Sequence, residues 1–130
     1  MPWCDHESVP MGSQEILVVD DDWNVGQVIA FLLADHGYAS RYASNGSIAL
    51  ELLAKAAADL VLMDLMMPIV DGPELLRQMR ATDEFALTPV LVMSEGPEHI
   101  ARRECPRATA FLRKPFTSAE LLDAVRAILG

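Results

Sequence analysis

Three short apolar runs recur along the chain, at residues 16–19, 60–63 and 90–93, and polar residues or prolines flank each of them. Runs of this length that are apolar throughout, without polar residues in alternation, are typical of strands buried on both faces of a parallel sheet. Two weaker candidates lie at 38–42 and 110–112. Because parallel strands need a crossover between them, the segments that separate these runs should be helical.

Apolar residues in those segments recur with the period of a helix. The predicted stripes are Val25, Val28, Ile29, Leu32 and Leu33; Ile48, Leu52, Leu53 and Ala56; Leu75, Leu76 and Met79; and Leu121, Leu122, Val125, Ile128 and Leu129. Gly37 follows the first stripe as a helix-ending glycine, and Thr117 with Glu120 forms a capping box that opens the last helix. The sequence therefore predicts an α/β fold of (βα)5 type, a three-layer sandwich with helices on both faces of the sheet.

Size and charge narrow the possible functions. A chain of 130 residues and 14.3 kDa allows one domain, which we place at residues 15–130, with 1–14 a disordered tail or in part a cloning remnant. The formal net charge of −9 argues against direct binding of nucleic acid. No apolar run approaches the ~18 residues of a membrane span, and the start of the chain does not resemble a secretory signal, so we expect a cytoplasmic protein with no membrane partner.

Acidic residues stand at the ends of two predicted strands. Asp20 and Asp21 follow the first strand in ILVVDDD, and Asp64 ends the third in DLVLMD. In parallel sheets, ligands bind beyond the carboxyl ends of the strands, so the three carboxylates meet if these strands are neighbours. Like charges raise one another's pKa, and such a cluster makes sense only around a cation. A hard divalent ion with oxygen ligands, Mg²⁺ above all, is the natural candidate, with Mn²⁺ a possible substitute.

A hydroxyl and an ammonium group reach the same edge of the sheet. Ser94 ends the fourth predicted strand in PVLVMS, and Lys114 ends the fifth in FLRKPF. An anion that needs Mg²⁺, a lysine and a hydroxyl donor, next to a carboxylate that can act as nucleophile, is most simply a phosphoryl group in transfer.

Four motifs, ILVVDDD, DLVLMDLMMPIVDG, TPVLVMS and FLRKPF, together resemble the receiver domain of two-component response regulators, over residues 15–130. The resemblance implies a flavodoxin-like fold with a parallel five-stranded sheet of order 2-1-3-4-5. It also implies a set of roles, with a cis bond between Lys114 and Pro115. These roles are Asp64 as phosphoacceptor, Asp20 and Asp21 as metal ligands with the Met66 backbone carbonyl, Ser94 and Lys114 as partners of the phosphoryl group, and Ser94 and Phe111 as switch residues.

The function implied by the resemblance is phosphorylation-dependent signalling. A histidine kinase or a phosphotransfer protein would give its phosphoryl group to Asp64 in the presence of Mg²⁺, and the change would alter binding of a downstream protein target. Such a domain is not an enzyme acting on other substrates. Its catalysis is confined to its own phosphorylation and dephosphorylation.

The chain also departs from the family pattern between Ser94 and Lys114. The segment carries two prolines and only one large aliphatic residue, so the fourth helix should be short or irregular, over residues 98–104. Three residues should modulate the chemistry. Met66 should obstruct a water attacking phospho-Asp64, Gly96 offers no side chain to hold that water, and Glu95 adds charge at the rim unless it turns to solvent or pairs with Arg102 or Arg103.

Two other classes of function stay open. The pattern Asp20-x-Asp22 after an apolar strand also resembles the nucleophile motif of haloacid-dehalogenase-like phosphatases, although 130 residues leave little room for their cap and further acidic motifs. The second alternative is a pseudo-receiver that binds partners without phosphorylation. The presence of Asp64, Ser94 and Lys114 argues against it, and the altered fourth helix keeps it open.

Overall fold

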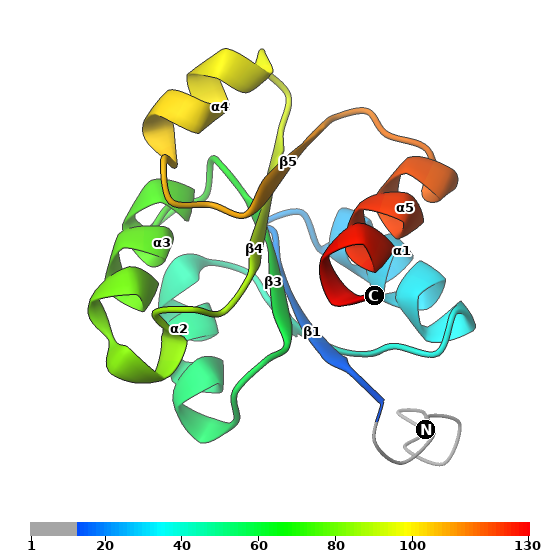
Figure 1. The fold of residues 1–130 in the computed structure, drawn as a ribbon, viewed down its shortest axis with the longest axis horizontal. Coiled ribbons are helices and arrows are strands. Elements are labelled where there is room, and N and C mark those ends of the chain that lie inside the picture. The colour runs from blue at the N-terminus through cyan, green and yellow to red at the C-terminus, as the bar shows by residue number, and fades with distance from the viewer. Residues whose placement is uncertain (1–12) are drawn as a thin grey trace.

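The computed structural model describes residues 13–130, so most of the segment predicted as a tail lies outside the described residues. Five strands alternate with five helices, and a short 3-10 helix, η2, precedes β4 (Figure 1). The elements are β1 (Glu15–Val19), α1 (Trp23–Asp35), β2 (Ala39–Ala43), α2 (Gly46–Lys55), β3 (Leu60–Asp64), α3 (Gly72–Ala81), η2 (Asp83–Phe85), β4 (Val90–Ser94), α4 (Glu98–Glu104), β5 (Ala110–Arg113) and α5 (Ser118–Leu129).

All five strands form one parallel sheet of order β2-β1-β3-β4-β5, which confirms the predicted flavodoxin-like architecture. β1 and β3 are neighbours, with Val19 opposite Met63, and Asp64 lies opposite Met93 on β4. The register therefore brings the carboxyl ends of β1, β3 and β4 to one edge of the sheet. This is the edge at which the acidic residues were predicted to meet.

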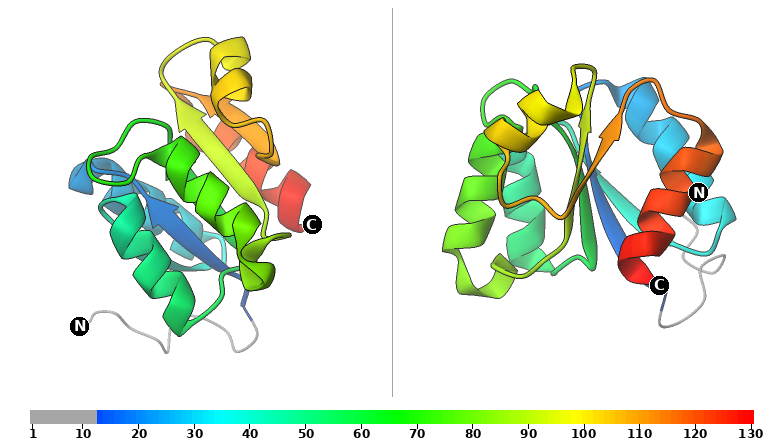
Figure 2. Two further views of the ribbon diagram at one scale, coloured as in Figure 1. Left: turned by 90° about the vertical axis from the view of Figure 1, so that its left-hand side faces the viewer. Right: turned by 45° about the horizontal axis from the view of Figure 1, so that its top comes forward.

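Helices cover both faces of the sheet and make it a three-layer sandwich (Figures 1 and 2). Alternate residues of each central strand point to opposite faces. On β1, Ile16 and Val18 pack in the core under α1 and α5, whereas Leu17 and Val19 pack in the core under α2 and α3. The central strands are apolar throughout because both of their faces are buried.

The apolar stripe predicted for α1 includes one residue, Val28, that is exposed to solvent in the structure. Val28 is 60% exposed, whereas Gly26, Ile29 and Leu33 are buried. Residues 26, 29 and 33 repeat at helical spacing on one face, and Val28 lies about 100° around the helix from Ile29. The face of α1 that is buried in the core is therefore the one that carries Gly26, Ile29 and Leu33.

The helix ends follow the predicted capping chemistry. The carboxylate of Asp22 caps α1 by accepting the N–H groups of Asn24 and Val25. Gly37 follows α1 with φ of 88°, the left-handed conformation that favours glycine, and Thr117 with Glu120 forms the reciprocal capping box of α5.

A short fourth helix and two long-range sets of hydrogen bonds complete the fold. α4 spans seven residues, as the prolines predicted. The Gln14 side chain donates a hydrogen bond of 3.3 Å to the Leu129 carbonyl at the end of α5. The Arg80 guanidinium, at the end of α3, donates to the carbonyls of Phe85, Thr88 and Arg107, and so joins segments far apart in the sequence. No helix within residues 13–130 is long and apolar enough to span a bilayer.

Candidate functional site

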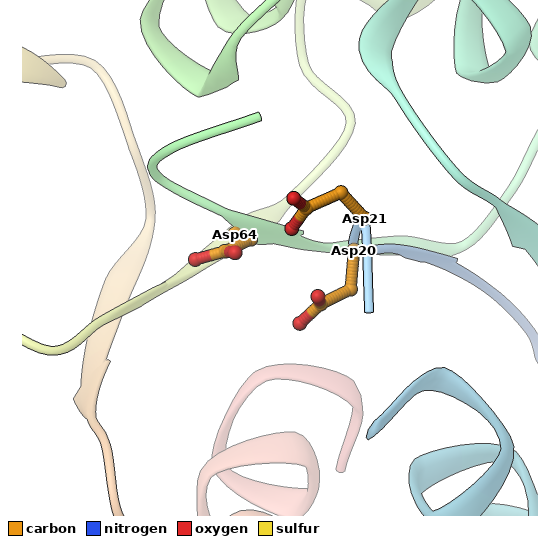
Figure 3. A group of neighbouring side chains, drawn as sticks. All are labelled: Asp20, Asp21 and Asp64. Carbon is orange, nitrogen blue, oxygen red and sulfur yellow. The ribbon is translucent and has the colours of Figure 1, made fainter. Parts of the chain in front are cut away.

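Three carboxylates meet where β1 and β3 end. Asp20 and Asp21 follow β1 directly, and Asp64 is the last residue of β3. Each offers an oxygen within 4.8 Å of the other two. Figure 3 shows the three side chains next to one another. Asp20 is fully buried, Asp64 is intermediate and Asp21 is exposed. The prediction that strand order would gather these acids is confirmed.

Lys114 is the cation that faces this cluster. It follows β5, and its ammonium lies 3.1 Å from Oδ2 of Asp20 and 3.6 Å from Oδ1 of Asp64. The peptide bond between Lys114 and Pro115 is cis, as the family resemblance predicted. The Lys114 backbone N–H also donates to the Ser94 carbonyl at 2.8 Å, which joins the ends of β4 and β5.

One lysine does not balance three carboxylates. Burial raises the pKa of Asp64 to about 6, and Asp20 and Asp21 add to the rise against the opposing effect of Lys114. Burial alone would lower the pKa of Lys114, but Asp64 and Asp20 outweigh it, so that the pKa is raised. The lysine therefore stays charged, while Asp64 binds a proton more readily than an ordinary carboxyl group.

Two hydrogen bonds that the sequence did not predict hold Asp20 at the end of β1. The Tyr42 hydroxyl, on β2, donates a 2.6 Å hydrogen bond to the backbone carbonyl of Asp20. Oδ1 of Asp20 accepts the N–H of Asp22 at 2.9 Å. Burial, followed by the charges of Asp20, Asp21 and Asp22, raises the pKa of Tyr42. The first bond holds the Asp20 backbone from β2, and the second holds the Asp20 side chain from the turn that follows β1.

A crevice of about 420 Å³ opens above Asp64. Its wall contains the three residues predicted to modulate the site, Met66, Glu95 and Gly96, and two residues that were not predicted, Leu65 and, on α4, Ile100. The lining residues are Asp21, Asp64, Leu65, Met66, Ser94, Glu95, Gly96 and Ile100. Ser94 is 7% exposed and its Oγ accepts the N–H of Gly96 at 3.2 Å. Met66, by contrast, is 73% exposed at the rim.

Phe111 lies apart from the carboxylates, on β5 under α4. It is half-buried against the core below α2 and α3, and the Arg102 guanidinium lies 4.8 Å from the centre of its ring. Arg102 also pairs with Glu98 at 2.7 Å, so it is engaged with Glu98 and not with Glu95. Glu95 itself is exposed. Of the alternatives considered for Glu95, pairing with Arg102 is not seen, because Arg102 is paired with Glu98.

The turn after Asp64 depends on a glycine. A Cβ on Gly72 would lie 2.7 Å from the Asp64 carbonyl and 2.9 Å from the Leu65 carbonyl, closer than real Cβ contacts. The Gly72 N–H donates to the Leu65 carbonyl at 3.1 Å, and Asp71 caps α3 by accepting the N–H of Glu74. Gly72 thus lets the start of α3 pack directly on the backbone that carries Asp64.

The donor set fits a hard divalent cation. Three carboxylates converge, one of them has a raised pKa, and the nearby Lys114 leaves the cluster with an excess of negative charge. Oxygen donors of this kind suit Mg²⁺ and Mn²⁺. With a buried hydroxyl and an ammonium beside it, the crevice has the groups needed to hold a phosphoryl anion next to a carboxylate nucleophile.

Comparison with known proteins identifies the family. The family model described as the response regulator receiver domain matches residues 16–126. The response regulator MprA of Mycolicibacterium vanbaalenii is 38% identical over 115 residues, which are 88% of this chain and 49% of that protein. MprA of Mycobacterium ulcerans is 37% identical over 118 residues, 90% of this chain and 50% of that protein. The chain spans about half the length of these curated relatives.

Solved structures agree with this result. The chemotaxis protein CheY4 of Vibrio cholerae is 29% identical with a TM-score of 0.83, and the match covers 90% of this chain and 99% of that one. The receiver domain of a Pseudomonas aeruginosa sensor histidine kinase, solved with a magnesium ion in its active-site cleft, is 28% identical with a TM-score of 0.84, over 92% and 99% of the two chains. The strand order, the acidic crevice and these matches agree: the chain belongs to the response regulator receiver domain family.

Proposed function

We propose that this domain accepts a phosphoryl group on Asp64 and that the modification changes its binding of a downstream protein. The observation that carries the proposal is the meeting of three carboxylates with Lys114, beside a crevice that is lined by Asp64 and by Ser94. A site with an anionic nucleophile and paired cationic and hydroxyl groups is suited to phosphoryl transfer, which depends on positioning and on charge neutralisation.

In the proposed reaction a carboxylate oxygen of Asp64 attacks the phosphorus of a donor phosphohistidine. The new O–P bond forms as the P–N bond breaks, and the electron pair of that bond goes to the imidazole nitrogen, which then takes up a proton. Lys114, 3.6 Å from Asp64, would neutralise charge on the transferring group, and Ser94 would donate its hydroxyl to a phosphoryl oxygen. The raised pKa of Asp64 means that the nucleophilic form predominates above about pH 6 in the metal-free protein.

Asp20, Asp21 and Asp64 would hold Mg²⁺, with the Met66 backbone carbonyl as a further ligand. The cation supplies neutralisation of the carboxylates and of the phosphoryl oxygens. Its binding would also lower the pKa of Asp64 and so favour the ionised nucleophile.

The partners follow from this chemistry. A histidine kinase or phosphotransfer protein would be the donor, and a downstream protein the target, inside the cytoplasm where such donors act. The domain would not turn over other substrates. The absence of direct nucleic-acid contacts stays a prediction from the acidic composition.

The phosphatase alternative requires Asp22 as a second catalytic acid beside Asp20. Asp22 caps α1 by accepting the N–H groups of Asn24 and Val25, and the carboxylates grouped with Asp20 are those of Asp21 and Asp64. We therefore expect no turnover of a chromogenic phosphate ester. The pseudo-receiver alternative is decided by the phosphorylation experiment itself.

Intact-mass spectrometry after incubation with acetyl phosphate and MgCl₂ tests the proposal. The parent should gain the mass of one phosphoryl group, and Asp64→Asn should gain none. Asp83→Asn, a change to an exposed carboxylate of η2, is the matched control and should gain as much as the parent. An unmodified parent, or a gain retained by Asp64→Asn, contradicts the proposal.

A further inference from the structure

Tyr42 joins three elements of the fold next to the acidic cluster. It lies on β2 opposite Val18 of β1, and its half-buried ring packs against the core under α1 and α5. A Cβ on Gly26 of α1 would lie 2.3 Å from Cε1 of the ring, so the lack of a side chain at residue 26 lets the ring rest against the helix. From this position the Tyr42 hydroxyl reaches past the end of β1 to the Asp20 carbonyl, at 2.6 Å.

The carbonyl that Tyr42 binds belongs to the peptide unit between Asp20 and Asp21. Asp20 is fully buried, and a buried carbonyl requires a donor. Within residues 13–130 the one donor to this carbonyl is the Tyr42 hydroxyl. Because a peptide unit is planar, the direction of the Asp20 carbonyl also fixes the direction in which the chain continues to the Cα of Asp21. The hydroxyl therefore orients the backbone link between two of the three clustered carboxylates (Figure 3).

Other groups hold the rest of Asp20. Its N–H donates to the Ala43 carbonyl at 3.1 Å, and its carboxylate is bound by the Asp22 N–H and by the Lys114 ammonium. The side chain of Asp21, by contrast, is exposed, so packing does not set its direction. The direction of the Asp21 carboxylate thus depends on the backbone that carries it, and that backbone is held by Tyr42.

We infer that Tyr42 is a positioning residue for the cation of the proposed phosphorylation site. Its hydroxyl holds the peptide unit between Asp20 and Asp21 in the orientation in which both carboxylates can bind one Mg²⁺. The inference rests on the function proposed above. Mg²⁺ requires near-ideal octahedral geometry, so ligands that are oriented before the ion arrives give the higher affinity. Groups that orient metal ligands without touching the ion typically raise metal affinity by about 10- to 100-fold.

A purely structural role for the hydroxyl predicts a different result. If the hydrogen bond only satisfies a buried carbonyl, its loss lowers the melting temperature and leaves the Mg²⁺ affinity of the folded protein unchanged. A dissociation constant measured while every variant is fully folded therefore separates the two roles.

Tyr42→Phe removes the hydroxyl and keeps the ring against Gly26. Isothermal titration calorimetry with MgCl₂, at a temperature at which circular dichroism shows each protein to be folded, should give a dissociation constant raised by about tenfold, the lower end of the range for orienting groups. Tyr38→Phe is the matched control. It removes the hydroxyl of the chain's other tyrosine, which directly precedes β2 and packs against the same core, and it should bind Mg²⁺ as the parent does.

The Mg²⁺ dependence of phosphorylation by acetyl phosphate gives a second measurement. The MgCl₂ concentration that gives half of the maximal rate should rise in Tyr42→Phe by about the same factor as the dissociation constant. The rate at saturating MgCl₂ should change little, because the hydroxyl does not touch the reacting groups. Tyr38→Phe should match the parent in both quantities.

An unchanged dissociation constant in Tyr42→Phe overturns the inference, whatever the melting temperature, because the hydroxyl is then only structural. So do an equal rise in Tyr38→Phe, a lower maximal rate at an unchanged half-saturating concentration, and a parent that binds no Mg²⁺. A parent that binds Mg²⁺ but is not phosphorylated contradicts the proposed function alone, since the comparison of affinities still decides the role of Tyr42.

Discussion

Replacing Asp64 with asparagine should stabilise the metal-free protein at neutral pH, and the gain should disappear in acid. The pKa of Asp64 is raised from 3.8 to about 6 in the folded protein. Between these values the folded protein holds the proton and the unfolded chain has released it, so the free energy of unfolding falls as pH rises. A difference of about two pKa units corresponds to about 3 kcal/mol, at 1.36 kcal/mol per unit. This stability is fully present below about pH 4 and is lost by about pH 7.

Asparagine has no proton to lose, so the difference between the variant and the parent isolates this contribution. It should grow from near zero at pH 4 to about 3 kcal/mol at pH 7.5. The assay is urea denaturation followed by circular dichroism, in the presence of a chelator, from pH 4 to pH 8. Titrating groups far from the crevice act equally in both proteins and cancel. Asp83→Asn controls for the loss of a carboxylate elsewhere.

Mg²⁺ should remove most of this difference. The cation binds the folded carboxylates and stabilises the parent at neutral pH, whereas the variant lacks one ligand and should gain less. A stability difference that does not vary with pH, or an asparagine variant less stable than the parent at pH 7.5, would refute the argument that crowded, buried carboxylates strain the metal-free crevice. A parent whose stability Mg²⁺ leaves unchanged would refute the metal site.

Three further outcomes are expected. Met66→Asn should speed hydrolysis of phospho-Asp64, measured by loss of the phosphorylated mass with time, because it removes bulk at the rim and adds a group that can hold water; an equal or slower rate counts against obstruction. Glu95→Gln should be phosphorylated by acetyl phosphate a few times faster than the parent at low salt, with the advantage shrinking as salt screens the charge. If Glu95→Ala alone is faster, the effect is steric. Arg80→Met should lower the free energy of unfolding by about 1–3 kcal/mol because three carbonyls lose their donor, whereas the same change at the exposed Arg103 should have little effect.

The sequence predicts those parts of the fold in which a local run of residues and the rules for connecting parallel strands lead to the same structure. Apolar runs gave the central strands, and the rule that ligands bind at the carboxyl ends of parallel strands placed Asp20 and Asp64 together once β1 and β3 were neighbours. The length of α4 followed from its prolines. These inferences need only neighbours in sequence and a small set of allowed connections.

The remaining features depend on contacts between distant residues, which leave no local pattern. Nothing near Tyr42 indicates that its hydroxyl supports the Asp20 carbonyl, and nothing near Arg80 indicates that its partners include the carbonyl of residue 107. Ile69 would be expected to be extended, because β-branched residues favour strands, yet its φ is 68° in a loop closed by the hydrogen bond between Gly72 and Leu65. Arg102 could have paired with either Glu95 or Glu98, and the helical spacing of four residues favoured Glu98.

The hydrogen bond from Gln14 to the Leu129 carbonyl makes this fold a convenient insert for protein engineering. It joins the residue before β1 to the end of α5, while Asp20 lies at the other end of β1. A host protein could therefore carry residues 14–129 within one of its surface loops, with both splice points side by side and the crevice facing away from the host. The same proximity would allow a short linker to join these ends and the chain to be opened at Leu87, giving a circular permutant.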